Sequence, residues 1–262
     1  MSFFYTNWWL IPLTITIFSG ILCPAMGTVL ITHRRLLQVN LISHCVLPGL
    51  ALAISLGIHP SIGGVISGLS GAIIAESLTD KRHENYEAVM NTILSGMLGL
   101  GVLLIPLLGI RIDLEAVLFG DLLTANLEDL LRTLIAFSIF STLIIFGYDK
   151  IVYVGLDPEG ASASGIKVSS LNLALSFTTA LVIVSSMSAV GVILVIALLS
   201  TPTLLGLNKA NSLWVAMAKS SFYGLLISTL GFLLAIVFNL SPGPAIGVLC
   251  VLSLILLRRK TT

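Results

Sequence analysis

The sequence predicts an all-α fold, a polytopic helical bundle that crosses a membrane about nine times. Hydrophobic residues make up 56% of its 262 residues, charged residues only 10%, and the mean hydropathy is +1.08. Soluble domains carry about 25% charged residues. The few charges lie in short segments between long apolar runs, and the alternating pattern of an outer-membrane barrel is missing.

Each spanning helix needs about 20 mostly apolar residues. Nine segments qualify: 8–32, 39–57, 61–78, 88–110, 129–148, 170–187, 189–207, 214–238 and 243–257. The sixth and seventh are nearly continuous, so a break near residue 187 leaves eight to ten helices open. Small residues at Gly64, Ser67, Gly68 and Gly71 predict a face where another helix approaches closely.

The basic residues predict the orientation, because Lys and Arg favour cytoplasmic loops. With the N-terminus outside and the C-terminus cytoplasmic, every Lys and Arg except Arg111 and Arg132 falls on the cytoplasmic side. The outer loop 111–128 is then acidic. We therefore expect a multi-pass protein of the plasma membrane in this orientation.

Several function classes are excluded by what the sequence lacks. It contains no GxxxxGK[ST] phosphate loop, no HExxH zinc motif and no GxSxG nucleophile motif. Its formal net charge is +1, which gives no basis for binding nucleic acid. Cys23, Cys45 and Cys250 lie in apolar runs without metal-ligand spacing, which indicates packing. An enzyme acting alone is not expected, and neither is a bound cofactor.

One span carries an unusual pair of polar side chains, Asn40 and His44. They are four residues apart, so a helix places them on one face. An ionisable residue inside a span is a candidate functional residue, and a neutral imidazole binds first-row metals. The alternative is a histidine and an asparagine that form hydrogen bonds to other helices. Glu76 lies near a span end, where we expect it to snorkel or cap.

Five segments in order along the chain resemble the ABC-3 metal permease family, the membrane subunits of ABC importers for zinc and manganese. They are RRLLQVNLISHCVLPGLALA at 34–53, IRIDLEAVLFGDLLTANLEDL at 110–130, LDPEGASASGI at 156–166, SAVGVILVIALLSTP at 188–202 and SPGPAIGVL at 241–249. The second segment is more similar to zinc permeases than to manganese permeases. The resemblance implies an ABC importer permease bundle, with residues 1–262 forming a single transmembrane permease domain.

The resemblance also implies partners. Such a permease pairs with itself as a homodimer in the bacterial inner membrane, sits on a separate ABC ATPase subunit, and receives the ion from an extracytoplasmic metal-binding protein. LDPEGASASGI corresponds to the family's ATPase-coupling segment, here Asp157, Pro158, Glu159, Gly160, Ala161 and Gly165. Asp157 followed by Pro158 also has the pattern of a helix N-cap with proline at the first helical position.

The family's metal path uses an acid and a histidine of the second helix. The histidine corresponds to His44, but Asn40 stands where the family has Asp, and Val39 where it has Gly. We expect His44 and Asn40 to be transient ligands, and Asp121 to be a residue at the mouth of the path. Zinc is favoured over manganese, with ferrous iron third, because imidazole suits zinc. The alternatives are an ABC permease for a metal chelate and a secondary carrier driven by an ion gradient.

Overall fold

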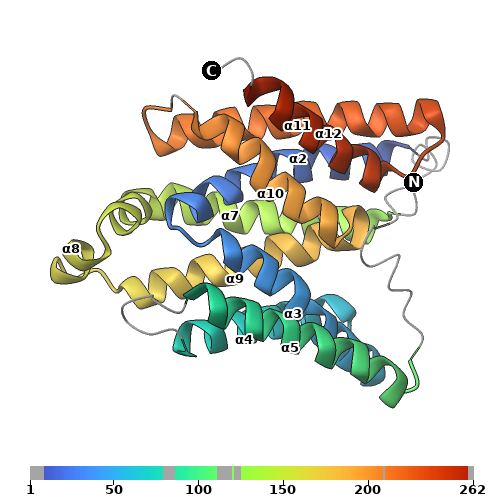
Figure 1. Cartoon of the computed structure of the whole chain (residues 1–262), viewed down its shortest axis with the longest axis horizontal. Coiled ribbons are helices and arrows are strands. Elements are labelled where there is room, and N and C mark those ends of the chain that lie inside the picture. Colours follow the sequence, from blue (N-terminus) through green and yellow to red (C-terminus); the bar gives the residue numbers. More distant parts are fainter. Residues whose placement is uncertain (1–8, 79–85, 111–119, 121–124, 209, 259–262) are drawn as a thin grey trace.

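The computed structural model describes residues 9–78, 86–110, 120, 125–208 and 210–258. Within these residues the chain forms helices and no strand (Figure 1). The helices are α2 (Leu10–Thr32), α3 (Leu36–Ser55), α4 (Pro60–Leu78), α5 (Tyr86–Leu107), α7 (Leu127–Leu156), α8 (Pro158–Ala163), α9 (Val168–Val190), α10 (Val192–Leu207), α11 (Leu213–Phe238) and α12 (Pro242–Arg258).

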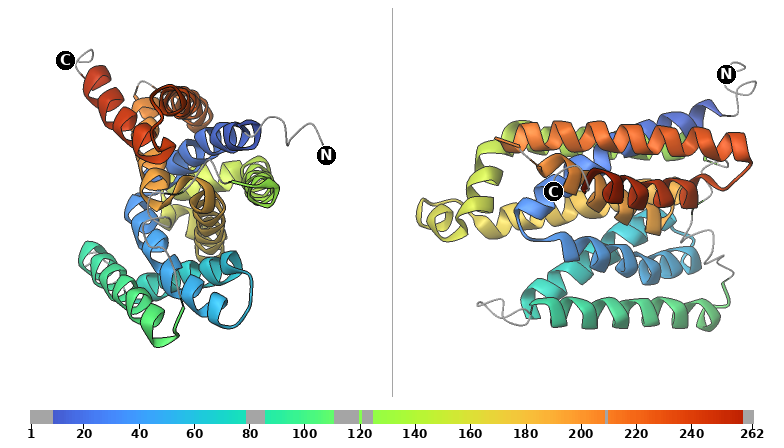
Figure 2. Two further views of the ribbon diagram at one scale, coloured as in Figure 1. Left: turned by 90° about the vertical axis from the view of Figure 1, so that its right-hand side faces the viewer. Right: turned by 45° about the horizontal axis from the view of Figure 1, so that its top comes forward.

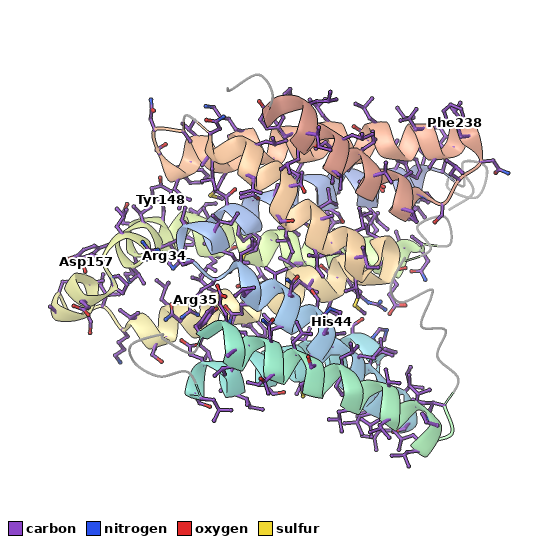
Figure 3. The ribbon with its side chains drawn as sticks, in the orientation of Figure 1. Arg34, Arg35, His44, Tyr148, Asp157 and Phe238 are labelled. Carbon is purple, nitrogen blue, oxygen red and sulfur yellow. The ribbon has the colours of Figure 1, made fainter. Side chains whose placement is uncertain are left out.

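The all-α membrane fold is confirmed, and each of the nine predicted segments corresponds to an apolar helix. Seven of these helices are long and apolar enough to cross a membrane, and α10 and α12 are shorter apolar helices. Consecutive apolar helices run in opposite directions along the bundle (Figure 1). Figure 3 shows Arg34, Arg35 and Asp157 at one end, here called the α8 end, and Phe238 at the other, here called the far end.

Helix α7 is longer than the predicted segment 129–148. It continues to Leu156, because the residues after Asp149 and Lys150 still place apolar side chains against the bundle. Ile151 is fully buried and Val154 nearly so. The charged pair therefore marks the edge of the apolar zone without ending the helix, and α7 extends beyond it toward α8.

The predicted break between the sixth and seventh segments lies at Gly191, four residues later than expected. Gly191 has a φ of 86°, in the left-handed region that favours glycine. It separates α9 from α10 at the far end. Helix α9 is long enough to cross a membrane and α10 is a shorter apolar helix, so the predicted count of nine is approximate.

The helices form three neighbouring groups, which the end-on view of Figure 2 separates. Helix α3 packs mainly against α4 and α5 on one side of the molecule. Helices α2, α7, α9 and α10 fill the middle. Helix α11 lies against α2 and α10 on the opposite side, and α12 packs on α11 and α10. The middle helices thus separate the α3–α4–α5 group from α11 and α12.

The contact between α3 and α4 is tight enough to involve the backbone. A Cβ atom on Gly49 would collide with the Gly63 backbone, and one on Gly63 would collide with the Gly49 backbone. The Ser67 hydroxyl donates to the Cys45 carbonyl oxygen at 2.6 Å. A Cβ on Gly68 would press on the side chain of Ile42, and one on Gly71 would collide with the side chain of Cys45. The predicted small-residue face of α4 is confirmed, and its partner is α3.

This close approach gives a stability prediction. Gly49→Leu forces a side chain into the Gly63 backbone, so we expect destabilisation beyond the ~1–3 kcal/mol of ordinary overpacking. Gly99→Leu on α5 is the matched control, since nothing lies within 4 Å of a Cβ there. Thermal unfolding in detergent should show a large loss for Gly49→Leu only. Equal midpoints for the two variants would contradict the α3–α4 contact.

Candidate functional site

Helix α3 presents Asn40 and His44 on its least covered face. Both side chains are half-buried, whereas Leu41, Ile42, Ser43 and Cys45 around them are buried. His44 lies along the middle part of α3 (Figure 3). In the described part of the chain, neither side chain has a hydrogen-bonding or ionic partner. Two polar groups one helical turn apart are therefore available to a ligand or to another chain.

The pair offers one imidazole nitrogen and one amide oxygen, which is an incomplete metal site. Among the described residues, no group of three or more His, Cys, Asp or Glu side chains is arranged to hold a metal ion. Stable zinc sites have four ligands, and catalytic zinc sites keep three protein ligands. A site with two neutral ligands suits brief contact with a passing ion better than permanent binding.

Asp121, expected at the mouth of the path, lies outside the described residues. Its neighbour Gly120 is described and has a φ of 69°. A Cβ on Gly120 would collide with the backbone of Val190 and Gly191. Gly120 therefore lies against the junction between α9 and α10.

A second polar cluster lies at the far end, where the α3–α4 turn meets the start of α7. The Glu128 carboxylate is 2.6 Å from Arg132 and 3.1 Å from Nε2 of His59. Arg132 also contacts Asp129 at 3.2 Å, and Asn126 forms a capping box with Asp129. His59 accepts the Ser61 N–H at Nδ1 and so caps α4. Sequence spacing did not indicate this cluster, because His59 and Glu128 are far apart in the chain.

At the other end, α8 projects beyond the bundle between α7 and α9 (Figures 1 and 2). As predicted, Asp157 caps α8: its carboxylate accepts the Gly160 N–H at 2.9 Å, and Pro158 is the first helical residue. Gly165 has a φ of 88°, and the N–H groups of Gly165 and Ile166 close the C-terminus on Ser162 and Ala161. Ala161 is fully buried, whereas Glu159 is exposed. These caps give a short, rigid element with one exposed side.

The turn before α3 adds charged residues at the α8 end. Arg35 forms an ion pair with Glu76 of α4 at 2.9 Å, so the acid expected to snorkel or cap has a partner. His33, two residues before Arg35, is half-buried, and its Nε2 atom is buried. Burial lowers the pKa of His33, and the nearby Arg35 lowers it further, while the carbonyl of Ile151 acts in the opposite direction. His33 is therefore held neutral in the folded protein near physiological pH.

The sequence profile of the ABC 3 transport family matches residues 8–259. The chain belongs to the ABC 3 transport family. It is similar to the "Manganese import system permease protein ScaB" of Streptococcus parasanguinis, with 32% identity over 87% of this chain and 81% of the relative. It is also similar to the "Chelated iron transport system membrane protein YfeD" of Yersinia pestis, with 31% identity over 89% of this chain and 78% of the relative.

The fold agrees with a solved member. The structure of "PsaBC from Streptococcus pneumoniae in complex with Fab" superposes with a TM-score of 0.86 at 30% identity, covering 95% of this chain and 90% of that chain. Membership and fold together identify the chain as a multi-pass membrane subunit of an ABC transporter. It is a transport component and not an enzyme in its own right, and its activity requires an ATPase partner.

The lowered pKa of His33 predicts how stability changes with pH. An unfolded histidine titrates near 6.5, and the folded pKa lies below that value, so the unfolded state binds the proton first. His33 therefore contributes stability above about pH 6.5, which is lost as the pH falls through the folded pKa. The thermal midpoint in detergent should fall between about pH 7.5 and about pH 5.5, and this fall should be larger for wild type than for His33→Phe. Equal losses would assign the pH dependence to other groups.

Proposed function

We propose that this chain is the permease of an ABC importer that carries a divalent transition-metal ion into the cytoplasm. The observation that carries the proposal is the pair Asn40 and His44. Both side chains are half-buried, lie one helical turn apart on α3, and have no partner among the described residues of this chain, which belongs to the ABC 3 transport family. In this proposal both are transient ligands along the path. Asp121, at the mouth of the path, receives the ion first.

The ligand chemistry of Asn40 and His44 favours brief binding and release of the ion over tight binding. A divalent ion at a site of low dielectric is strongly attracted by a carboxylate, and Asn40 replaces that carboxylate by a neutral oxygen. The lost attraction is partly offset, because an amide costs less to bury than an ionised acid. The ion then binds less tightly to α3 and leaves it faster.

The proposed cargo is manganese first and zinc second. The residues of segment 110–130 and the imidazole of His44 favoured zinc. A relative named for manganese supports manganese instead, and the amide oxygen of Asn40 is a ligand type that suits manganese. The metal chelate is the remaining alternative from the sequence, and nothing in the described residues specifically favours a secondary carrier.

The exposure of Asn40 and His44 also supports a homodimer. Polar groups that face hydrocarbon without a partner are costly. A second copy placed against this face of α3 would cover both side chains and would bring two His44 and two Asn40 side chains to one path. Four neutral ligands from two chains would then meet the ion.

The orientation follows from the charges at the α8 end. Arg34, Arg35 and α8 share that end, and the preference of positive charge for the cytoplasm supports a cytoplasmic α8 end, where in this proposal the ATPase subunit binds α8. The far end then faces outward and receives the extracytoplasmic metal-binding protein at the acidic loop before α7. This puts the N-terminus outside and the C-terminus in the cytoplasm of a bacterial inner membrane, with residues 1–262 acting as one transmembrane permease domain.

The first test is metal uptake. In proteoliposomes that contain the complex with its ATPase and binding protein, His44→Ala should lower ATP-dependent uptake of radioactive manganese at least about tenfold, equivalent to ~1.4 kcal/mol. Asn40→Asp should strengthen metal binding by restoring a charge. Asn91→Ala, exposed on α5, is the control. Unchanged uptake by His44→Ala would remove His44 from the path, and uptake of a metal chelate alone would favour the alternative cargo.

The second test concerns α8. Deleting residues 157–166 should abolish association with the ATPase, while the protein still inserts in the membrane, since these residues lie beyond the apolar spans. Co-purification of the ATPase with the deletion variant and with wild type measures the effect. Persistent association would mean that the ATPase binds elsewhere on the α8 end.

A further inference from the structure

The turn between α2 and α3 has a rigid and partly strained backbone. Helix α2 ends in a Schellman motif: the Arg34 N–H donates to the Ile31 carbonyl at 2.9 Å, and the Arg35 N–H donates to the Leu30 carbonyl at 2.8 Å. Arg34 occupies the left-handed position with a φ of 57°, which usually takes glycine. The turn therefore holds α2 and α3 at a defined angle, with Arg34 exposed and His33 directed inward.

His33 lies against the last turns of α7. Its ring is so close to Gly155 that a Cβ there would lie 3.2 Å from Nε2 and 3.3 Å from Cδ2 of His33. The ring also interacts with the backbone carbonyl of Ile151, one turn earlier. Gly155 is two residues before Asp157, which caps α8. The ring thus touches α7 immediately before the coupling segment begins.

The ring meets Gly155 by close packing, while its hydrogen bond goes to the carbonyl of Ile151. Nε2 of His33 is buried and has no hydrogen-bonding partner among the described residues. A buried polar atom without a partner costs free energy, so the imidazole is not held there by that nitrogen. What the ring supplies is a flat side chain that fits the space left by the missing side chain of Gly155.

On its other side, the turn is tied to the helices that carry the proposed ligands. Arg35 begins α3 and pairs with Glu76 of α4 at 2.9 Å. The backbones of α3 and α4 are in contact at Gly49 and Gly63, so the two helices are closely packed. A displacement of the turn is therefore a displacement of α3, with Asn40 and His44 on it.

We propose that His33 is a positioning residue for transport, which transmits movement of α8 through the end of α7 to α3 and so to Asn40 and His44. The inference rests on the proposed function. When the ATPase moves α8, the last turn of α7 pushes or releases the His33 ring. The rigid turn passes this displacement to α3 without absorbing it. Removing the ring uncouples ATP hydrolysis from metal movement and leaves both partners bound.

The test measures metal transported per ATP hydrolysed in the reconstituted complex, with radioactive manganese as the probe. His33→Ala should lower this ratio at least about fivefold, the lower end of ordinary coupling between sites, while ATP hydrolysis continues. His33→Phe should restore it, because phenylalanine keeps the ring. Gly155→Ala should also lower the ratio, because the added Cβ would press on the His33 ring. Gly147→Ala is its control on the same helix, since a Cβ there meets only ordinary contacts from 3.5 Å.

The outcomes separate the two proposals. If the wild-type complex hydrolyses ATP but moves no metal, the proposed function fails, and this inference fails with it. If wild type transports and His33→Ala stays within about twofold of it, or His33→Phe does not restore a lost ratio, the role of His33 is wrong. If co-purification shows that His33→Ala does not assemble with the ATPase, the comparison of Gly155→Ala with Gly147→Ala decides instead. Equal ratios of metal transported per ATP in these two variants would overturn the role of His33.

Discussion

The whole structure depends on one constraint: inside a bilayer, a polar group without water must find its partner within the protein. The helices meet it in detail. The hydroxyls of Thr28 and Thr203 both donate to the Pro24 carbonyl, at 2.8 and 3.0 Å. Gln38 donates to Ser176 at 2.7 Å and so joins α3 to α9. Asn40 and His44 on α3 are half-buried and have no partner among the described residues, so a ligand or another chain can supply one.

Helix α7 connects the two ends of the molecule. Its first turn joins the cluster of Glu128, Arg132 and His59 at the far end, and its last turn contacts His33 before entering α8. A helix of 30 residues spans about 45 Å at the usual rise, longer than the ~30 Å hydrocarbon core. The extra turns at that end carry α8 outside the apolar zone while it stays attached to a spanning helix.

Most of the fold was predictable, because hydrophobic length and the loss of charge determine where helices cross lipid. The cap of Asp157 and Pro158 was predictable for a similar reason, since it is local in sequence. Neither the His33–Gly155 contact nor the cluster of His59 with Glu128 was predictable. Both join residues far apart in the chain, and packing brings them together without a pattern in either segment. The end of α7 was misjudged because Asp149 and Lys150 looked like a loop, although Ile151 and Val154 are buried.

The replacement of an acid by Asn40 has a mechanical consequence for a path of this kind. Movement through a pore requires sites that bind an ion well enough to admit it and weakly enough to release it. In the proposed path, the neutral ligands Asn40 and His44 would bind the ion weakly, so little work would be needed to release it. A small displacement of α3 is then sufficient to change whether the ion stays. In the proposed coupling, the close contact of His33 with Gly155 and the ion pair of Arg35 with Glu76 would carry such a small displacement from α8 to α3.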